Sequence, residues 1–371
     1  MVRIFLFIFG YFTYTNSSFA SNQKTFGDSS KFIFESKIHY GFVISHHKYM
    51  THLTTSHFPA FEFNIGKQTN SEKTWQSLYD NPIIGVSYWY ADLKNPNVLG
   101  SAHALYPYLN FHIYKKKSFI INYRFGIGIA YLTKKFDRFD NYKNIAIGSH
   151  LNASINMCYE FKWQMFKKIF FSASIGITHF SNGAIKLPNP GINIPSLSLG
   201  LAYPISVNSK NNLKQNEKNS YDFVKKTQII SVISGSIKEI YPTCGDKYGA
   251  FSLSTFYLKP LSFKRKIGAG IDLFWDFSNI RTLKRKNIEI NHSFEAIRFG
   301  FFVGHQFDFS KLSFITHLGC YAYAKDKSDG LVYSRIGLRY NLNKKLLLNL
   351  TLKTHFAKAD FLECGFGYRF F

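Results

Sequence analysis

The 371-residue sequence is basic, with 46 Lys and Arg against 22 Asp and Glu and a formal net charge of +24. Its 40 Phe, 24 Tyr and 25 Gly accompany a mean hydropathy of only −0.13, so apolar residues are spread along the chain instead of gathered in blocks. After the first 20 residues no run of about 18 apolar residues occurs, which excludes a transmembrane helix and favours strands that alternate apolar and polar residues.

The first twenty residues have the pattern of a secretory signal peptide. Arg3 supplies the positive charge, residues 4–12 form a short apolar core, and residues 18–20, Ser-Phe-Ala, end in a small-x-small cleavage pattern. We therefore predict a signal peptide over 1–20 and an exported protein. Such a protein does not meet nucleic acid, so the positive charge is no sign of a nucleic-acid partner.

Eight strands are predicted up to residue 204. Their expected bounds are 36–45, 58–66, 83–91, 102–113, 118–132, 144–161, 169–181 and 193–204. From Phe119 to Tyr131 every odd-numbered residue is apolar, whereas the even-numbered positions include Asn122, Arg124 and two Gly. Alternation of this kind places apolar side chains toward lipid and polar ones in a barrel lumen, where we expect His150 and Glu160.

Polar residues flank the loop between the last two of these strands. Strand periodicity places His179 and Ser181 on the apolar face of segment 169–181, and Asn193 on the apolar face of the next strand. If residues 182–192 form a hairpin loop, Ser181 and Asn193 lie opposite each other, with His179 two residues away. A nucleophile, a base and an amide then meet at an apolar surface, although turn formers at a strand end would give the same residues.

The segment THFSNGAIKLPNPGINIP (178–195) resembles the signature of the PagL-type, acyloxyacyl hydrolase-like outer-membrane lipid A deacylases. The shared pattern is His-aromatic-Ser-Asn, then Pro-Asn six residues later, then Gly and a polar residue that leads into a strand. Pro188, Asn189 and Gly191 restrict the backbone of the loop and are expected to shape it. Beyond these 18 residues the resemblance rests only on the strand layout of the first half.

The resemblance implies that His179 and Ser181 are catalytic, and that Asn182 and the backbone N–H of Gly183 stabilise an oxyanion. The chain has Asn193 where the family has Glu. An Asn side-chain carbonyl can orient an imidazole but brings no negative charge. The excess of positive charge would suit the phosphorylated glycolipid of the outer leaflet, and a compositional bias toward Lys and Asn would explain it equally well.

Residues 205–227 are polar, rich in Lys and Asn and without periodicity, so they are predicted to be a seam between two halves, 21–204 and 228–371. Eight more strands are expected near 228–238, 248–258, 265–276, 294–307, 312–324, 331–340, 345–356 and 361–370. The halves read as copies, because Thr-His-Phe-Ser at 178–181 is matched by Thr-His-Phe-Ala at 354–357.

In the second copy the alternation places the histidine of the Thr-His-Phe motif on the opposite face of its strand. The leucines at 346, 348, 350 and 352 form the apolar face, so His355 points into the lumen. Other charged residues share this inner parity: Arg335, Arg339, Lys353, Glu363 and Arg369. The same parity places Cys158 inside and Cys320 and Cys364 outside, and the four cysteines have neither disulfide-framework nor metal spacing. The C-terminal FGYRFF, with aromatics at every second position, resembles the terminal signal of outer-membrane barrels.

These observations predict an all-β fold, a transmembrane antiparallel β-barrel with about eight strands per repeat, as one barrel of 16 strands or two of eight. With the resemblance they imply a serine esterase that removes an ester-linked acyl chain from lipid A of lipopolysaccharide. We expect it in the outer membrane of a Gram-negative bacterium, inserted by the barrel-assembly machinery, with external loops at 46–57, 92–101, 133–143 and 182–192. Neither a cofactor nor a metal is expected. The alternative is a non-catalytic outer-membrane barrel, namely a pore, adhesin or scaffold.

Overall fold

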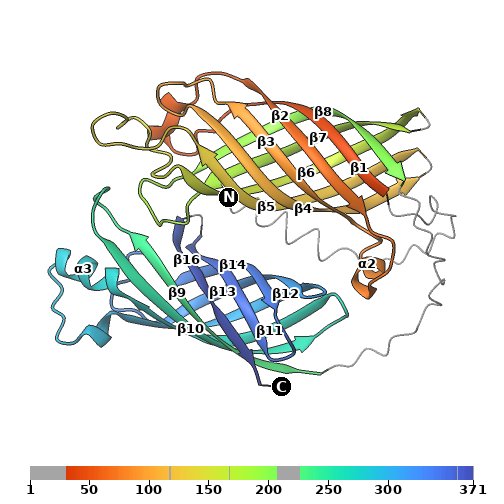
Figure 1. Cartoon of the computed structure of the whole chain (residues 1–371). Helices are drawn as coiled ribbons and strands as arrows, with labels where there is room; N and C mark the ends of the chain where they lie inside the picture. Colours follow the sequence, from red (N-terminus) through yellow and green to blue (C-terminus); the bar gives the residue numbers. More distant parts are fainter. Residues whose placement is uncertain (1–30, 117, 167, 207–225, 357, 371) are drawn as a thin grey trace. The chain divides into compact units, whose positions relative to one another are not determined.

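The alternating segments of the sequence form sixteen strands in the computed structural model, which describes residues 31–116, 118–166, 168–206, 226–356 and 358–370. Strands β1 to β8 close into one antiparallel barrel and β9 to β16 into a second (Figure 1). The predicted fold class is confirmed, and the number of barrels is two. The predicted signal peptide, most of the polar seam and Phe371 lie outside the described residues.

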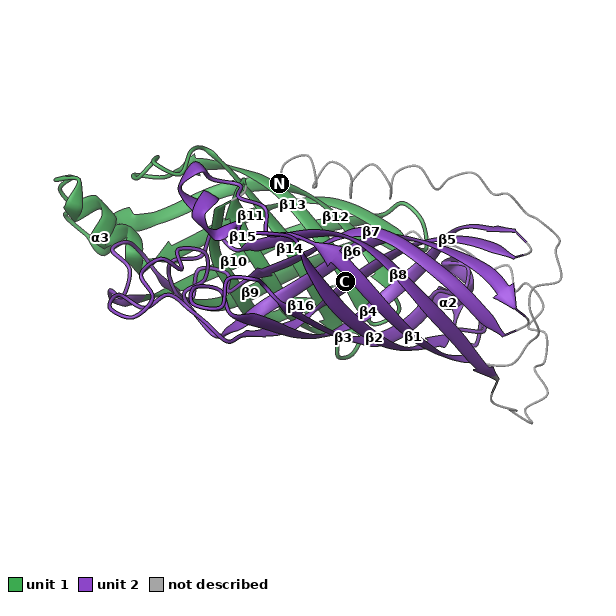
Figure 2. Cartoon of the chain, turned by 90° about the horizontal axis from the view of Figure 1, so that it is seen from above, with its two compact units in different colours: residues 1–28, 213–237, 248–371 green, residues 29–212, 238–247 purple. Residues whose placement is uncertain are grey.

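The first barrel is closed by pairing of its first and last strands. Its strands are β1 (Lys31–Gly41), β2 (Phe58–Gln68), β3 (Ile83–Asp92), β4 (Ser101–Lys116), β5 (Phe119–Leu132), β6 (Leu151–Phe166), β7 (Ile169–Ser181) and β8 (Ile192–Ser206). Its loops contain the 3-10 helix η1 (Lys48–Leu53) and the short helix α2 (Thr74–Leu78). This barrel forms one compact unit, to which residues 238–247 also belong (Figure 2).

The second barrel forms most of the other compact unit. Its strands are β9 (Gln228–Glu239), β10 (Lys247–Pro260), β11 (Arg265–Asp276), β12 (Ile297–Phe309), β13 (Leu312–Tyr323), β14 (Val332–Asn341), β15 (Leu346–His355) and β16 (Lys358–Arg369). Helix α3 (Phe277–Arg285) and the 3-10 helix η2 (Ser293–Ala296) lie between β11 and β12. None of the helices in the described ranges has the length and apolarity needed to span a membrane.

Two of the predicted strands are displaced. The first runs over 31–41 instead of 36–45, and the sixth begins at Leu151 instead of residue 144. Alternation extends into residues 144–150 because Ala146 and Ile147 are also buried, but they are buried in a loop that packs over the barrel end. His150 precedes the strand and stacks on Tyr131 with its ring centroid 5.4 Å away, so its predicted place in the lumen is wrong.

The lumen of the first barrel is filled by a buried ion-pair network. The Arg124 guanidinium donates to carboxylates of Glu35 at 2.7 Å, Glu62 at 2.8 Å and Glu160 at 2.9 Å, which confirms the inward position predicted for Glu160. The Lys37 ammonium donates to Glu160 at 2.5 Å. Removing one partner of such a network leaves an uncompensated buried charge at a cost of about 3–5 kcal/mol. The network therefore joins β1, β2, β5 and β6 across a packed interior.

The second lumen has its own charged cluster, as the strand parity predicts. Arg335 donates to Glu363 at 2.6 Å and to Asp272 at 3.1 Å, and Lys353 donates to Asp360 at 2.5 Å. Arg339 and His355 are buried in the same interior, whereas Arg369 is half-buried. The cysteines also follow the predicted parity, with Cys158 buried and Cys320 and Cys364 exposed, and all four are free thiols.

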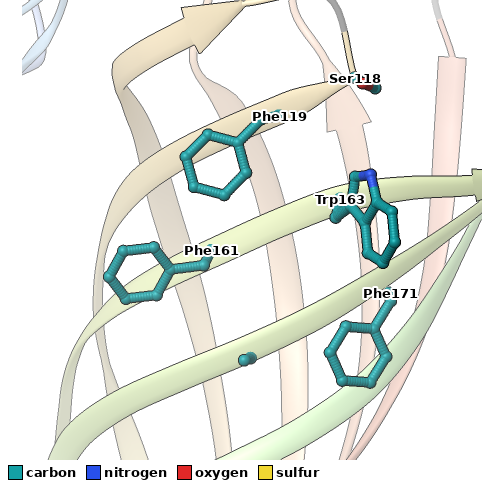
Figure 3. Close-up of a pocket in the computed structure, with 6 residues that line it drawn as sticks. Ser118, Phe119, Phe161, Trp163 and Phe171 are labelled. Carbon is teal, nitrogen blue, oxygen red and sulfur yellow. The ribbon is translucent and has the colours of Figure 1, made fainter.

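The outward faces of the strands are apolar. On β7 and β8 the side chains of Ile175 and Leu197 are 55% and 63% exposed. At the end of β7 far from Ser181, a shallow groove on β5, β6 and β7 is lined by aromatic rings (Figure 3). Its lining residues are Ser118, Phe119, Phe161, Trp163, Phe171 and Ala173. An apolar outer surface with aromatic residues near a strand end is typical of a barrel that faces lipid.

Candidate active site at the end of β7

A hydrogen-bonded row of three side chains lies where β7 ends and β8 begins. The His179 imidazole is placed with Nδ1 2.7 Å from the Asn193 carbonyl oxygen Oδ1 and Nε2 3.0 Å from the Ser181 hydroxyl. The structure thus brings together the three residues predicted to be catalytic. Their common outward face follows from the two-residue period of the strands.

The register of the two strands differs from the prediction. His179 itself pairs with Asn193, and Ser181 pairs with Ala153 of β6. The expected placement of Ser181 opposite Asn193 is therefore wrong by two residues, because pairing between β7 and β8 ends at Phe180 and Ile192. The observed register puts the histidine between the other two groups, which is the order that a relay from nucleophile to base to orienting group requires.

The row selects one tautomer of the histidine. The Oδ1 atom of Asn193 can only accept a hydrogen bond, so Nδ1 of His179 must donate to it. Nε2 then has a free lone pair and accepts from the hydroxyl of Ser181. This arrangement prepares the hydroxyl to lose its proton to the imidazole, which is general-base activation of a nucleophile.

Phe180, between the two candidate catalytic residues His179 and Ser181, anchors the strand end on the inner side. Its ring is completely buried in the apolar cluster at this end of the barrel and lies 5.7 Å from the ring centroid of Trp89. Met50 and Leu53 of the β1–β2 loop and Ile192 at the start of β8 belong to the same cluster. Burial of Phe180 forces its neighbours to face outward.

Gly191 lets the loop backbone lie directly against the histidine ring. Its φ is +86°, in the left-handed region that favours glycine. A Cβ atom at this position would stand 2.8 Å from Cε1 of His179 and 3.0 Å from the Phe180 carbonyl oxygen. The predicted loop-shaping role thus has a physical cause, because any side chain at position 191 would push the imidazole out of line.

The loop is held together by two asparagines. The backbone N–H of Asn182 donates to Oδ1 of Asn189 at 2.9 Å, and the side-chain amide of Asn182 donates to Ser149 Oγ at 2.8 Å and to the Lys186 carbonyl at 2.9 Å. Asn182 is thus already engaged through its donors. Pro188 follows a cis peptide bond in the same loop.

Two hydrogen-bond donors of the loop that follows Ser181 have no acceptor among the described residues. Within the described residues the backbone N–H of Gly183 has no acceptor. The side-chain amide nitrogen of Asn189 is buried and likewise has no hydrogen-bond partner there. A buried unpartnered donor is costly unless a ligand completes it. The sequence pattern indicates only a loop-shaping role for Asn189, since periodicity does not reveal an unsatisfied amide.

Asn193 has a further neighbour that the sequence does not predict. The Nδ2 atom of its amide lies 3.3 Å from Nδ1 of His46, in the loop between β1 and β2. His46 lies 147 residues away in the chain and belongs to no periodic segment, so no pattern pointed to it. No cluster of three or more His, Cys, Asp or Glu that could hold a metal ion occurs in the described parts of the chain.

Two family models match the chain. Residues 60–202 match the model described as Lipid A 3-O-deacylase (PagL), and residues 220–371 match the model described as Acyloxyacyl hydrolase, C-terminal domain. Together they span more than half of the sequence, and the first contains the whole row of catalytic candidates. Among curated proteins none matches the chain.

Solved structures of outer-membrane barrels resemble the chain weakly. The outer membrane enzyme PagL is 17% identical over 46% of this chain and 99% of its own, with a TM-score of 0.31. An outer membrane channel from Pseudomonas putida is 10% identical over 94% and 98%, with a TM-score of 0.20, and a porin variant from Rhodopseudomonas blastica is 8% identical over 92% and 100%, with a TM-score of 0.17. The family of the chain is shown by the two sequence models, which match residues 60–202 and 220–371.

Proposed function

Because the chain belongs to the PagL family of lipid A deacylases, we propose that it is an outer-membrane serine esterase that removes an ester-linked acyl chain from lipid A of lipopolysaccharide. The observation that carries the proposal is the hydrogen-bonded row of Ser181, His179 and Asn193 on the outward face of the first barrel. These residue types in this order are the components of acyl transfer by a serine nucleophile.

The reaction proceeds in two balanced steps. The Ser181 oxygen attacks the ester carbonyl carbon while its proton passes to Nε2 of His179, and the carbonyl oxygen becomes an oxyanion held by the Gly183 N–H and the Asn189 amide. When the intermediate collapses, the bond from the acyl carbon to the alcohol oxygen of lipid A breaks, and His179 returns the proton to that leaving oxygen. Water, deprotonated by His179, then attacks the acyl carbon, and the bond to the Ser181 oxygen breaks as His179 returns the proton to that oxygen, which releases the fatty acid.

Asn193 is expected to make this a slow member of its class. Its carbonyl keeps His179 in the productive tautomer, as a carboxylate would. An amide does not offset the charge of the imidazolium that forms during attack, and replacing Asp by Asn in a serine protease triad lowers turnover by about 10⁴-fold, although there the amide also favours the wrong tautomer. The orientation of the Asn193 amide is therefore decisive for the rate.

The position of the site suits a substrate that stays in the membrane. Ser181 follows the exposed apolar face of β7, and Leu197 continues that face on β8. A glycolipid in the outer leaflet can bring its ester to the strand end sideways, with its acyl chains along the apolar strands and its phosphates near the loops. The basic composition of the chain is compatible with such an anionic substrate.

A non-catalytic barrel is the second candidate, and the amide in place of the family carboxylate at position 193 favours it. Mass spectrometry of lipid A from cells that express the wild type, Ser181→Ala or no protein separates the two. Loss of one acyl chain only with the wild type supports the esterase, and identical lipid A in all three supports the scaffold. Ser118→Ala, at the opposite end of the barrel, is the matched control. Outer-membrane fractionation and heat-modifiable gel migration verify that each protein is assembled.

A further inference from the structure

The Asn193 amide has two ends, and only one of its orientations supports catalysis. With Oδ1 toward His179, Nδ1 of the imidazole donates and Nε2 accepts from Ser181. Turning the amide by 180° would place its NH₂ group against Nδ1, which would then have to accept. The proton would move to Nε2, and His179 would donate to the hydroxyl instead of taking its proton. A Glu at this position has no such ambiguity, since both of its oxygens accept.

His46 supplies the contact that distinguishes the two orientations. Its Nδ1 atom lies 3.3 Å from Nδ2 of Asn193, and an amide NH₂ group only donates, so Nδ1 of His46 accepts. In the flipped orientation the Oδ1 atom of Asn193 would face a lone pair of His46 as long as the His46 proton stays on Nε2, and bonding it would require the other His46 tautomer. We propose that His46 is a positioning residue that fixes the Asn193 amide and, through it, the tautomer of His179; the proposal rests on the esterase function proposed above.

The backbone around His46 is tied to the strand that carries Asn193. After the end of β1 the chain continues along β8, with the Phe42 N–H donating to the Pro195 carbonyl at 3.4 Å and the Ile44 N–H to the Asn193 carbonyl at 2.9 Å. This places residue 46 beside the Asn193 side chain. Further along the loop, Met50 and Leu53 are buried in the apolar cluster of the barrel end. The contact is therefore held by the fold on both sides.

His46 accepts only while it is neutral, and its surroundings favour that form. Burial, with a smaller contribution from the neighbouring His47, lowers the pKa of His46 below its ordinary value. The other titratable group that faces it is His179 on β7. Near neutral pH His46 is therefore neutral, and its tautomer with the proton on Nε2 offers the Nδ1 lone pair to the amide.

Two variants of His46, each in two backgrounds, test the proposal. His46→Asn retains an acceptor near the position of Nδ1, and His46→Leu removes it. With Asn193 present, we expect His46→Leu to lower ester release by about 3- to 10-fold, as the loss of one net hydrogen bond would, and His46→Asn to keep it within about twofold. In the Asn193→Glu background both should lie within about twofold of their parent, because a carboxylate needs no orientation. Equal losses in the two backgrounds, or no loss in either, overturn the proposal.

His52 provides the control in the same loop. It is exposed and bonds through Nε2 to the Lys143 carbonyl at 2.8 Å, away from the site, so His52→Leu should leave the rate unchanged. A loss as large as that of His46→Leu would mean that the loop simply fails to fold, and would overturn the positioning role.

A spectroscopic readout separates this inference from the proposed activity. In protein labelled with ¹⁵N-histidine in detergent micelles, the nitrogen shifts of His179 report its tautomer directly. We expect Nδ1–H in the wild type and in His46→Asn, and a mixture of tautomers in His46→Leu. If no protein releases fatty acid but the tautomer responds in this way, the esterase proposal fails and the positioning role stands. An unchanged tautomer in His46→Leu overturns the positioning role whatever the activity.

Discussion

The tripeptide Thr-His-Phe ends a strand in both barrels, with opposite results. At the end of β7, His179 lies on the outer side and Phe180 is completely buried. At the end of β15, His355 is buried in the lumen, where its Nε2 atom is 2.8 Å from the Tyr321 hydroxyl, and Phe356 is 61% exposed. The same three residues thus build a surface site in one barrel and an interior contact in the other.

The difference arises from strand parity and not from the motif. In β7 the odd-numbered residues face outward, whereas in β15 the even-numbered leucines do. Because side chains alternate, a shift of one residue moves every side chain of a strand to the other face. A motif that resembles a catalytic site therefore predicts a function only together with the face on which its residues lie. The second barrel has the same Thr-His-Phe tripeptide, but its histidine faces the lumen and the residue after Phe356 is Ala instead of Ser.

Replacing each histidine should produce the largest contrast. We expect His179→Ala to lower ester release by at least about 10³-fold, since it removes the general base of the proposed triad. His355→Ala should leave the rate within about twofold, because its imidazole faces the lumen of the other barrel. The measurement is fatty-acid release from lipid A in detergent micelles, for proteins that pass the heat-modifiable gel test. If His355→Ala abolished turnover in an assembled protein, the assignment of the active site to the first barrel would be wrong.

Replacing each phenylalanine tests the same parity through stability. Phe180→Ala should reduce the free energy of unfolding by about 3–5 kcal/mol, the usual cost of deleting a buried aromatic ring. Phe356→Ala should change it by less than about 1 kcal/mol, because the ring is largely exposed. Urea unfolding in detergent micelles measures both, with Phe356→Ala as the matched control. Similar losses for the two variants would contradict the opposite orientations.

Substitutions at position 193 test whether the site on the outward face of β7 and β8 lacks a carboxylate beside His179. Asn193→Glu should raise ester release by about 10- to 100-fold, the equivalent of about 1.4–2.8 kcal/mol, because a carboxylate stabilises the imidazolium that forms during attack. Asn193→Leu should nearly abolish release, since nothing would then orient His179. Equal rates for Asn, Glu and Leu would show that residue 193 does not orient the histidine. No activity in any of the three folded proteins would favour the non-catalytic barrel.

The smallest expected effect is on the pH dependence of the rate. Activity of the wild type needs His179 neutral, and protonation of His46 at acid pH should lower the rate by a further factor of about 3 to 10, the loss expected for His46→Leu. The pKa of His46 is lowered by burial, which places its protonation below the ordinary range near 6.5. His46→Asn retains the protonation of His179 but has no titrating group at position 46, so its rate should fall about 3- to 10-fold less than that of the wild type between neutral and acid pH. Identical pH profiles for the two proteins would exclude His46 protonation from the mechanism.

The sequence by itself determined what depends on local alternation. Most strand bounds, the outward direction of His179 and Ser181, and the charged interior of the second barrel all followed from a two-residue period, because each side chain's face depends only on its own strand. The resemblance of segment 178–195 added the family. Alternation predicted a strand that begins too early at residues 144–150, because apolar residues buried in a loop give the same sequence pattern as apolar residues of a strand.

Only the tertiary structure decided what depends on contacts between distant segments. Closure into two barrels follows from the pairing of β1 with β8 and of β9 with β16, and a period does not reveal which strands pair. The register that sets His179 opposite Asn193 depends on where the strand pairing stops at the loop. The unpartnered amide of Asn189 and the contact of His46 with Asn193 depend on how loops fold over the barrel end. Loop contacts join residues far apart in the chain, and no local pattern encodes them.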